Sequence, residues 1–99
     1  MQSRVAIDSY VIDTLLPDLV GHDRRPSAFI VYLYLLRASA RARTDGVVVS
    51  LQTIAVRTGL SKAAVQSAIR HLKRRGLLDD SATATTLRPL RRVLRPWRR

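Results

Sequence analysis

The sequence predicts a mainly helical fold with a small antiparallel β-sheet, an α+β domain. Three features predict it: two capped helical segments joined by a glycine turn within residues 50–76, a strongly apolar helical segment before them, and short apolar runs typical of strands on either side of the pair. The 99 residues suit one domain with a modest core.

The first helix of the pair is expected to begin after Ser50, whose hydroxyl can accept hydrogen bonds from the free amides of the first turn. Leu51, Ile54 and Ala55 then fall at helical spacing on one face. Gly59 stands where the chain must reverse, and glycine reaches positive φ without steric cost.

The second helix is expected to run from about Lys62 to Arg75, with Ser61 as its N-cap and Gly76 just beyond its end. Its inner stripe is apolar and consists of Val65, Ala68, Ile69 and Leu72. Its outer side is polar and basic, and it carries Lys62, Ala63, Gln66, Ser67, Arg70, Lys73 and Arg74.

The spacing A-x-x-x-G-L-S-x-x-x-V over residues 55–65 resembles the helix-turn-helix core of bacterial winged-helix regulators. The stretch RHLKRRGLL (70–78) looks like the end of a recognition helix entering the first wing strand in MarR-like and GntR-like domains. It is also similar to helix-turn-helix domains of plasmid replication initiators. The resemblance covers residues 47–80 and implies a winged helix-turn-helix that binds DNA. The alternative is a plain helical hairpin with a basic, solvated face.

The resemblance implies three core helices, an N-terminal segment and a two- to three-stranded antiparallel sheet. Residues 26–97 would form the winged helix-turn-helix domain, with the helix-turn-helix at 50–76 and the wing at 77–94. Residues 98–99 would follow as the end of a basic tail. The first strand is expected at residues 47–49 and would pair with the wing strands. Wing strands are expected to begin at Leu77–Leu78 and at Thr85–Leu87, and the second would continue through Leu90, Val93 and Leu94.

The first core helix is expected from about Pro26 to Ala42, with proline at its first position and Ser27 as a cap. Its centre, AFIVYLYLL, is apolar on nearly every face, so more than one side must be covered. Either the N-terminal segment and the helix-turn-helix cover it, or a homodimer buries Tyr32, Tyr34 or Leu35. Both arrangements can hold at once.

Residues 1–25 form an N-terminal segment that either packs on the core or reaches a partner subunit. A short strand or extended arm is expected between Val5 and Ile12, then a short helix capped by Asp13 and made irregular by Pro17. Residues 21–25 (GHDRR) are expected to form a polar loop.

Charge is distributed unevenly along the chain. Residues 1–23 hold four Asp and one Arg, a net of −3, whereas residues 24–99 hold 17 basic and three acidic residues, a net of +14. A region with this much net positive charge attracts the phosphate backbone of nucleic acids. The last twelve residues are also basic and form either a solvated end or a phosphate-gripping arm. Trp97 is expected to be a packing anchor in that tail.

Other function classes find little support. The chain has no Cys, and no motif places a nucleophile, metal ligands or a phosphate-binding glycine loop, so we expect no enzyme activity and no cofactor. Neither a signal peptide nor a membrane span is recognised, which favours a cytoplasmic, nucleoid-associated protein.

The sequence therefore predicts sequence-specific binding of double-stranded DNA by a bacterial transcriptional regulator, with the second helix in the major groove. Two alternatives are a replication or partition module and a protein-interaction module that docks an acidic partner. A homodimer would form through the N-terminal segment and the 26–42 helix. The expected DNA-binding residues are Thr53, Arg57, Ser61, Lys62, Ala63, Gln66, Ser67, Arg70, Lys73, Arg74, Arg88, Arg91 and Arg92.

Overall fold

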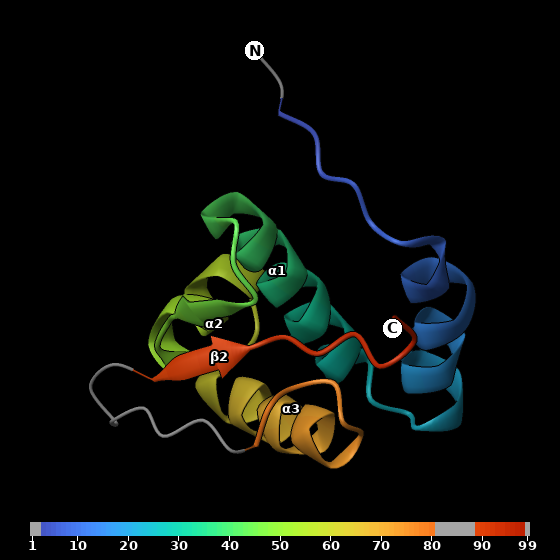
Figure 1. The fold of residues 1–99 in the computed structure, drawn as a ribbon. Helices are drawn as coiled ribbons and strands as arrows, with labels where there is room; N and C mark the ends of the chain where they lie inside the picture. Colours follow the sequence, from blue (N-terminus) through green and yellow to red (C-terminus); the bar gives the residue numbers. More distant parts are fainter. Residues whose placement is uncertain (1–2, 81–88, 99) are drawn as a thin grey trace.

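The computed structural model describes residues 3–80 and 89–98 (Figure 1). Two short π-helices come first, followed by a long helix, a strand, the helix pair and a last strand. In chain order they are η1 (Val11–Leu15), η2 (Asp18–His22), α1 (Pro26–Ala42), β1 (Gly46–Val48), α2 (Leu51–Thr58), α3 (Lys62–Arg74) and β2 (Leu90–Arg92). The architecture is mostly helical with a small antiparallel sheet, as a winged helix-turn-helix requires.

Helix α1 forms the centre of the domain and has the predicted bounds. Pro26 occupies its first turn, but the N-cap residue is Arg25 and makes no side-chain cap, so the prediction that Ser27 caps the helix is wrong. The helix contacts η2, α2, α3 and β1. Surrounding elements therefore cover most of its apolar surface within one chain, and Ile30 stays exposed.

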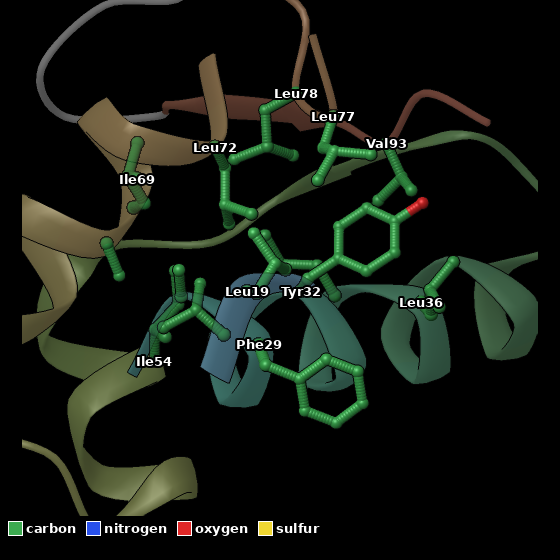
Figure 2. Close-up of a cluster of buried hydrophobic side chains, with 14 of the residues drawn as sticks. Leu19, Phe29, Tyr32, Leu36, Ile54, Ile69, Leu72, Leu77, Leu78 and Val93 are labelled. Atoms are coloured by element: carbon green, nitrogen blue, oxygen red, sulfur yellow. The ribbon is translucent and has the colours of Figure 1, made fainter. Parts of the chain in front are cut away.

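The core gathers around α1 (Figure 2). Tyr32 and Leu35 are fully buried, so neither is available to a dimer interface as the sequence had suggested. The Tyr32 hydroxyl donates to the carbonyl oxygen of Leu94 at 2.7 Å, which satisfies a buried polar atom and ties α1 to the chain after β2. Burial raises the pKa of this phenol far above its ordinary value.

The helix pair is built as predicted. The Ser50 and Ser61 hydroxyls accept from the amides of Thr53 and Ala64 at 3.1 and 3.0 Å. Gly59 has a φ of 81°, in the left-handed region, where the chain turns between α2 and α3.

Helix α3 ends in a Schellman motif. The Leu77 amide donates to the Leu72 carbonyl at 2.9 Å, and the Gly76 amide donates to the Lys73 carbonyl at 3.1 Å. Gly76 has a φ of 72° and is the predicted residue just past the helix. Leu72 and Leu77 are both buried, so the hydrophobic contact that accompanies this motif anchors the exit from α3.

The sheet differs in part from the prediction. Strands β1 and β2 pair antiparallel, which confirms that the strand before the helix pair joins the strand that returns from the wing. The strand expected at Leu77–Leu78 is reduced to one bridge between Leu78 and Val93. The strand start expected at Thr85–Leu87 lies outside the described residues.

The N-terminal segment is helical from Ser9 onward, so a helix replaces the strand or arm expected near Ile12, whereas residues 3–8 have no regular secondary structure. Val11 and Ile12 belong to η1, and Asp13 lies inside it and is not its cap. The wide i→i+5 turns align residues four apart, so that Val11, Leu15 and Leu19 are buried in the core. The polar loop expected at 21–25 begins later, because η2 continues to His22. The segment thus packs on its own domain.

The end of the chain folds back onto this segment. The Trp97 ring stacks on Tyr10 with centroids 4.7 Å apart, and its indole N–H donates to Asp8 at 2.9 Å. Arg98 makes two further hydrogen bonds to Asp8, each of 2.8 Å. Arg98 and then Trp97 lower the pKa of that carboxyl. Trp97 is the packing anchor predicted from the sequence.

Replacing Tyr32 by Phe tests the link between α1 and the C-terminal segment. The variant leaves the Leu94 carbonyl without its donor, so we expect the free energy of unfolding to fall by about 1–2 kcal/mol in urea titrations. Tyr34→Phe is the control, because the Tyr34 side chain is only half-buried. Equal stability of Tyr32→Phe and Tyr34→Phe would contradict a structural role for the 2.7 Å bond.

Candidate nucleic-acid interface

The outer face of α3 is polar, basic and open. Its exposed side chains follow one another at helical spacing and belong to Lys62, Ala63, Gln66, Arg70 and Arg74. Ser67 is half-buried beside them, and Ser61 is exposed at the cap. The opposite face is buried in the core, with Val65, Ala68, Ile69 and Leu72. Packing of that apolar stripe therefore fixes which side of α3 faces outward.

Helix α2 adds two exposed residues one turn apart, Thr53 and Arg57. The Thr53 amide and hydroxyl are both engaged by Ser50 at 3.1 Å, so Thr53 belongs to the cap of α2. Arg57 has no ion pair with any described residue.

The remaining predicted residues are held more closely by the protein. Lys73 is half-buried, with its Nζ 3.9 Å from an Asp80 carboxylate oxygen. Arg92 lies 3.4 Å from Asp79. Arg91 donates its Nε–H to the Val49 carbonyl at 3.1 Å, and partial burial lowers the pKa of its guanidinium. Arg88 lies outside the described residues.

A cluster that the sequence analysis missed lies at the C-terminal end of α3. The Asp23 carboxylate, only 8 % exposed, meets His71 Nε2 at 2.7 Å and Arg75 Nε at 3.0 Å. Arg75 also reaches Asp18, and His22 Nδ1 lies 2.9 Å from Asp23. The acidic N-terminal segment thereby binds the end of the helix that carries the basic face.

Electrostatics at this cluster follow from its hydrogen bonds. The hydrogen bond from His22, followed in size by that from His71, lowers the pKa of the Asp23 carboxyl to about 2, although burial acts to raise it. The bond to Asp23 raises the pKa of the His22 imidazole. His71 Nδ1 is buried without a partner among the described residues, so this ring contacts Asp23 through Nε2 alone.

A signal for this cluster exists in the sequence. Asp8, Asp13, Asp18 and Asp23 recur every five residues, and the interval from Asp18 to Asp23 equals one i→i+5 hydrogen-bonded turn of η2. The Asp23 amide donates to the Asp18 carbonyl at 2.8 Å, one such turn away. Asp18 and Asp23 consequently lie close enough to share Arg75.

Three residues of this cluster carry side-chain atoms that can also bind metal ions. One ligand-type atom from each of Asp18, His22 and Asp23 lies within 4.8 Å of the others. The Arg75 guanidinium already contacts both carboxylates and supplies a positive charge there. We therefore interpret the cluster as an ion-pair network that holds the N-terminal segment.

This arrangement of α2, turn and α3 defines a class of DNA-binding domain. Residues 25–78 match the model of a helix-turn-helix domain family, more than half of the chain, and the protein belongs to that family. Helix-turn-helix domains bind DNA and are typically not enzymes.

Searches of curated proteins and of solved structures gave no significant match. Among the described residues, none of the helices has the length and apolar composition that crossing a bilayer requires.

Replacing Asp23 by Asn tests the ion-pair network through pH. The folded-state pKa is depressed, so this carboxylate stabilises the fold above its unfolded value of 3.8, and the contribution disappears as pH falls through about 2. We expect Asp23→Asn to lower stability at pH 7 by about 1–2 kcal/mol and to flatten the loss of stability between pH 4 and 2.

Asp13→Asn is the matched control, because Asp13 is exposed and forms no ion pair with the described residues. Thermal unfolding followed by circular dichroism across that pH range measures both variants. Identical pH profiles for Asp23→Asn and Asp13→Asn would contradict the network.

Proposed function

We propose that the protein binds double-stranded DNA in a sequence-specific manner, with α3 in the major groove, and acts as a bacterial transcriptional regulator. The observation that carries the proposal is the exposed outer face of α3, in which polar and basic side chains stand opposite a fully packed apolar stripe. The proposed setting is the cytoplasm, in association with the nucleoid.

Gln66 and Arg70 are the proposed base-reading residues. Both are exposed and lie one turn apart on α3. A glutamine amide pairs in a bidentate way with adenine, and a guanidinium with O6 and N7 of guanine. Lys62, Ala63 and Ser67 are proposed to border the same bases or adjacent phosphates.

Phosphate contacts are proposed for the basic and hydroxyl residues around this face, which fix register without reading sequence. They are Thr53, Arg57, Ser61, Lys73, Arg74, Arg88, Arg91 and Arg92. Because the Arg91 Nε is engaged by Val49, a contact from Arg91 would use its terminal nitrogens.

The acidic N-terminal segment also bears on the choice of partner. A protein-interaction module would be favoured if acidic residues covered the outer face of α3. Instead, Asp18 and Asp23 reach His71 and Arg75 at its end, and Arg70 and Arg74 remain exposed. This observation supports DNA over an acidic protein partner. A replication or partition module would use the same face on repeated sites.

We expect Gln66→Ala and Arg70→Ala each to reduce discrimination between the preferred duplex and random duplex by about 1–3 kcal/mol, because each loses one bidentate base contact. Fluorescence anisotropy with a duplex selected from genomic DNA measures the ratio. Arg74→Ala is the comparison: it should weaken binding to all duplexes alike and reduce the salt slope by about one. Equal loss on every duplex for Gln66→Ala and Arg70→Ala would contradict base reading.

A homodimer is also proposed, since a two-fold dimer matches palindromic operators. Tyr32 and Leu35 are buried in the chain's own core, so the interface would use the exposed apolar residues Ile30 on α1, Ile12 on η1 and Val20 on η2.

Sedimentation equilibrium tests the homodimer. The wild-type chain is expected to dimerise, and Ile30→Asp to shift the equilibrium toward monomer, because a charge would be desolvated in the interface. Val56→Asp is the control, as Val56 is 70 % exposed on α2, an element that is not part of the proposed interface. A wild-type protein that is monomeric both free and on DNA would contradict the dimer.

A further inference from the structure

A basic hollow of about 170 Å³ lies where the outer side of α1 meets α2. Tyr34, Arg37, Ala38 and Arg41 line it from α1, and Arg57 lines it from α2. The α1 residues recur at three- and four-residue spacing, so they share one face of the helix. Figure 1 shows these two helices adjacent to each other.

The three arginines of this hollow have no carboxylate partner among the described residues. Six of the seven acidic residues are paired with other cations: Asp8 with Arg98, Asp18 with Arg75, Asp23 with His71 and Arg75, Asp45 with Arg95, Asp79 with Arg92 and Asp80 with Lys73. Asp13, the seventh, is exposed on η1 and does not line the hollow.

This arrangement is unfavourable for the free protein. Arg37 and Arg41 are four residues apart on α1, and like charges at that spacing destabilise a helix. Arg57 brings a third positive charge from a different helix. An anion held between them would convert this repulsion into attraction.

The chemistry of the lining indicates which anion fits. Guanidinium groups present planar forks of N–H donors that match the oxygens of a phosphate, and a phenol offers one further donor. Ala38 is small, so it leaves space between the longer side chains around it. We propose that Tyr34, Arg37, Arg41 and Arg57 form a phosphate-binding site, which takes either a free phosphate group or a phosphate of the DNA backbone.

The site goes beyond the proposed α3 interface and does not depend on it. Arg57 is shared with the proposed phosphate contacts of α2, whereas Arg37 and Arg41 belong to the hollow alone. The test therefore substitutes Arg37 and Arg41, so that its failure can be told apart from a failure of α3 to bind DNA.

Titration with inorganic phosphate at constant ionic strength, followed by NMR of the arginine Nε–H groups, tests the site directly. We expect saturable chemical-shift changes at Arg37, Arg41 and Arg57. The double variant Arg37→Gln/Arg41→Gln should bind phosphate at least fivefold more weakly than the wild type. Arg4→Gln/Arg25→Gln is the charge-matched control and should bind as the wild type does, since both residues are exposed outside the hollow. Ala38→Leu keeps every charge but fills the hollow, and it should also weaken binding.

A second arm distinguishes the source of the phosphate. If the shifts do not saturate with free phosphate, the site is expected to bind a phosphate of the DNA backbone. Arg37→Gln/Arg41→Gln should then reduce the salt slope of binding to a 30-base-pair duplex by about two relative to Arg4→Gln/Arg25→Gln. The proposal is overturned if free phosphate fails to saturate and both double variants change the slope equally. It is also overturned if phosphate saturates with equal affinity in both double variants, or if Ala38→Leu leaves binding unchanged in both arms.

Discussion

Burial of α1 determines how the other elements are arranged, because this helix is apolar on nearly every side and the domain has few residues with which to cover it. The helix pair and β1 cover part of it, and η2 covers another. The chain after β2 contributes the Leu94 carbonyl to the buried Tyr32 hydroxyl. The N-terminal segment and the tail are therefore structural parts of the domain, although neither belongs to the helix-turn-helix.

The same enclosure organises the charge of the molecule. The segment that covers α1 also carries four of the seven acidic residues. Three of its carboxylates, those of Asp8, Asp18 and Asp23, pair with Arg98 in the tail or with His71 and Arg75 at the end of α3. These pairs neutralise negative charge at the C-terminal end of α3 and in the tail, at the edge of the basic surface. Within residues 3–80 and 89–98, the exposed arginine in the middle of α3 and those of the hollow between α1 and α2 have no carboxylate partner, a distribution that favours phosphate ligands.

Local chemistry was predictable from the sequence and long-range pairing was not. Ser50, Ser61, Gly59 and Gly76 act within a few residues of themselves, so their roles as caps and turn residues follow from the chain alone. By contrast, the shortened strand at Leu77–Leu78 depends on a residue 15 positions away, Val93. The N-terminal segment buries Val11, Leu15 and Leu19 in the core and η2 packs on α1, and this tertiary packing overrode the strand-like pattern near Val11. The outer face of α3 was predictable because the apolar stripe on its opposite side was predictable. The hydrogen bond between Asp23 and His71 was not predictable, because it joins residues 48 positions apart.

We propose that the outer face of α3 recognises a particular DNA sequence. The most direct measurement is a fluorescence-anisotropy titration of labelled duplexes, random and enriched from genomic DNA, at several salt concentrations. We expect tight binding to one enriched sequence, with a steep salt slope and an affinity about a thousandfold or more above that for random duplex. Weak binding that is equal on all duplexes would contradict it, because only the electrostatic attraction of a basic protein would then remain.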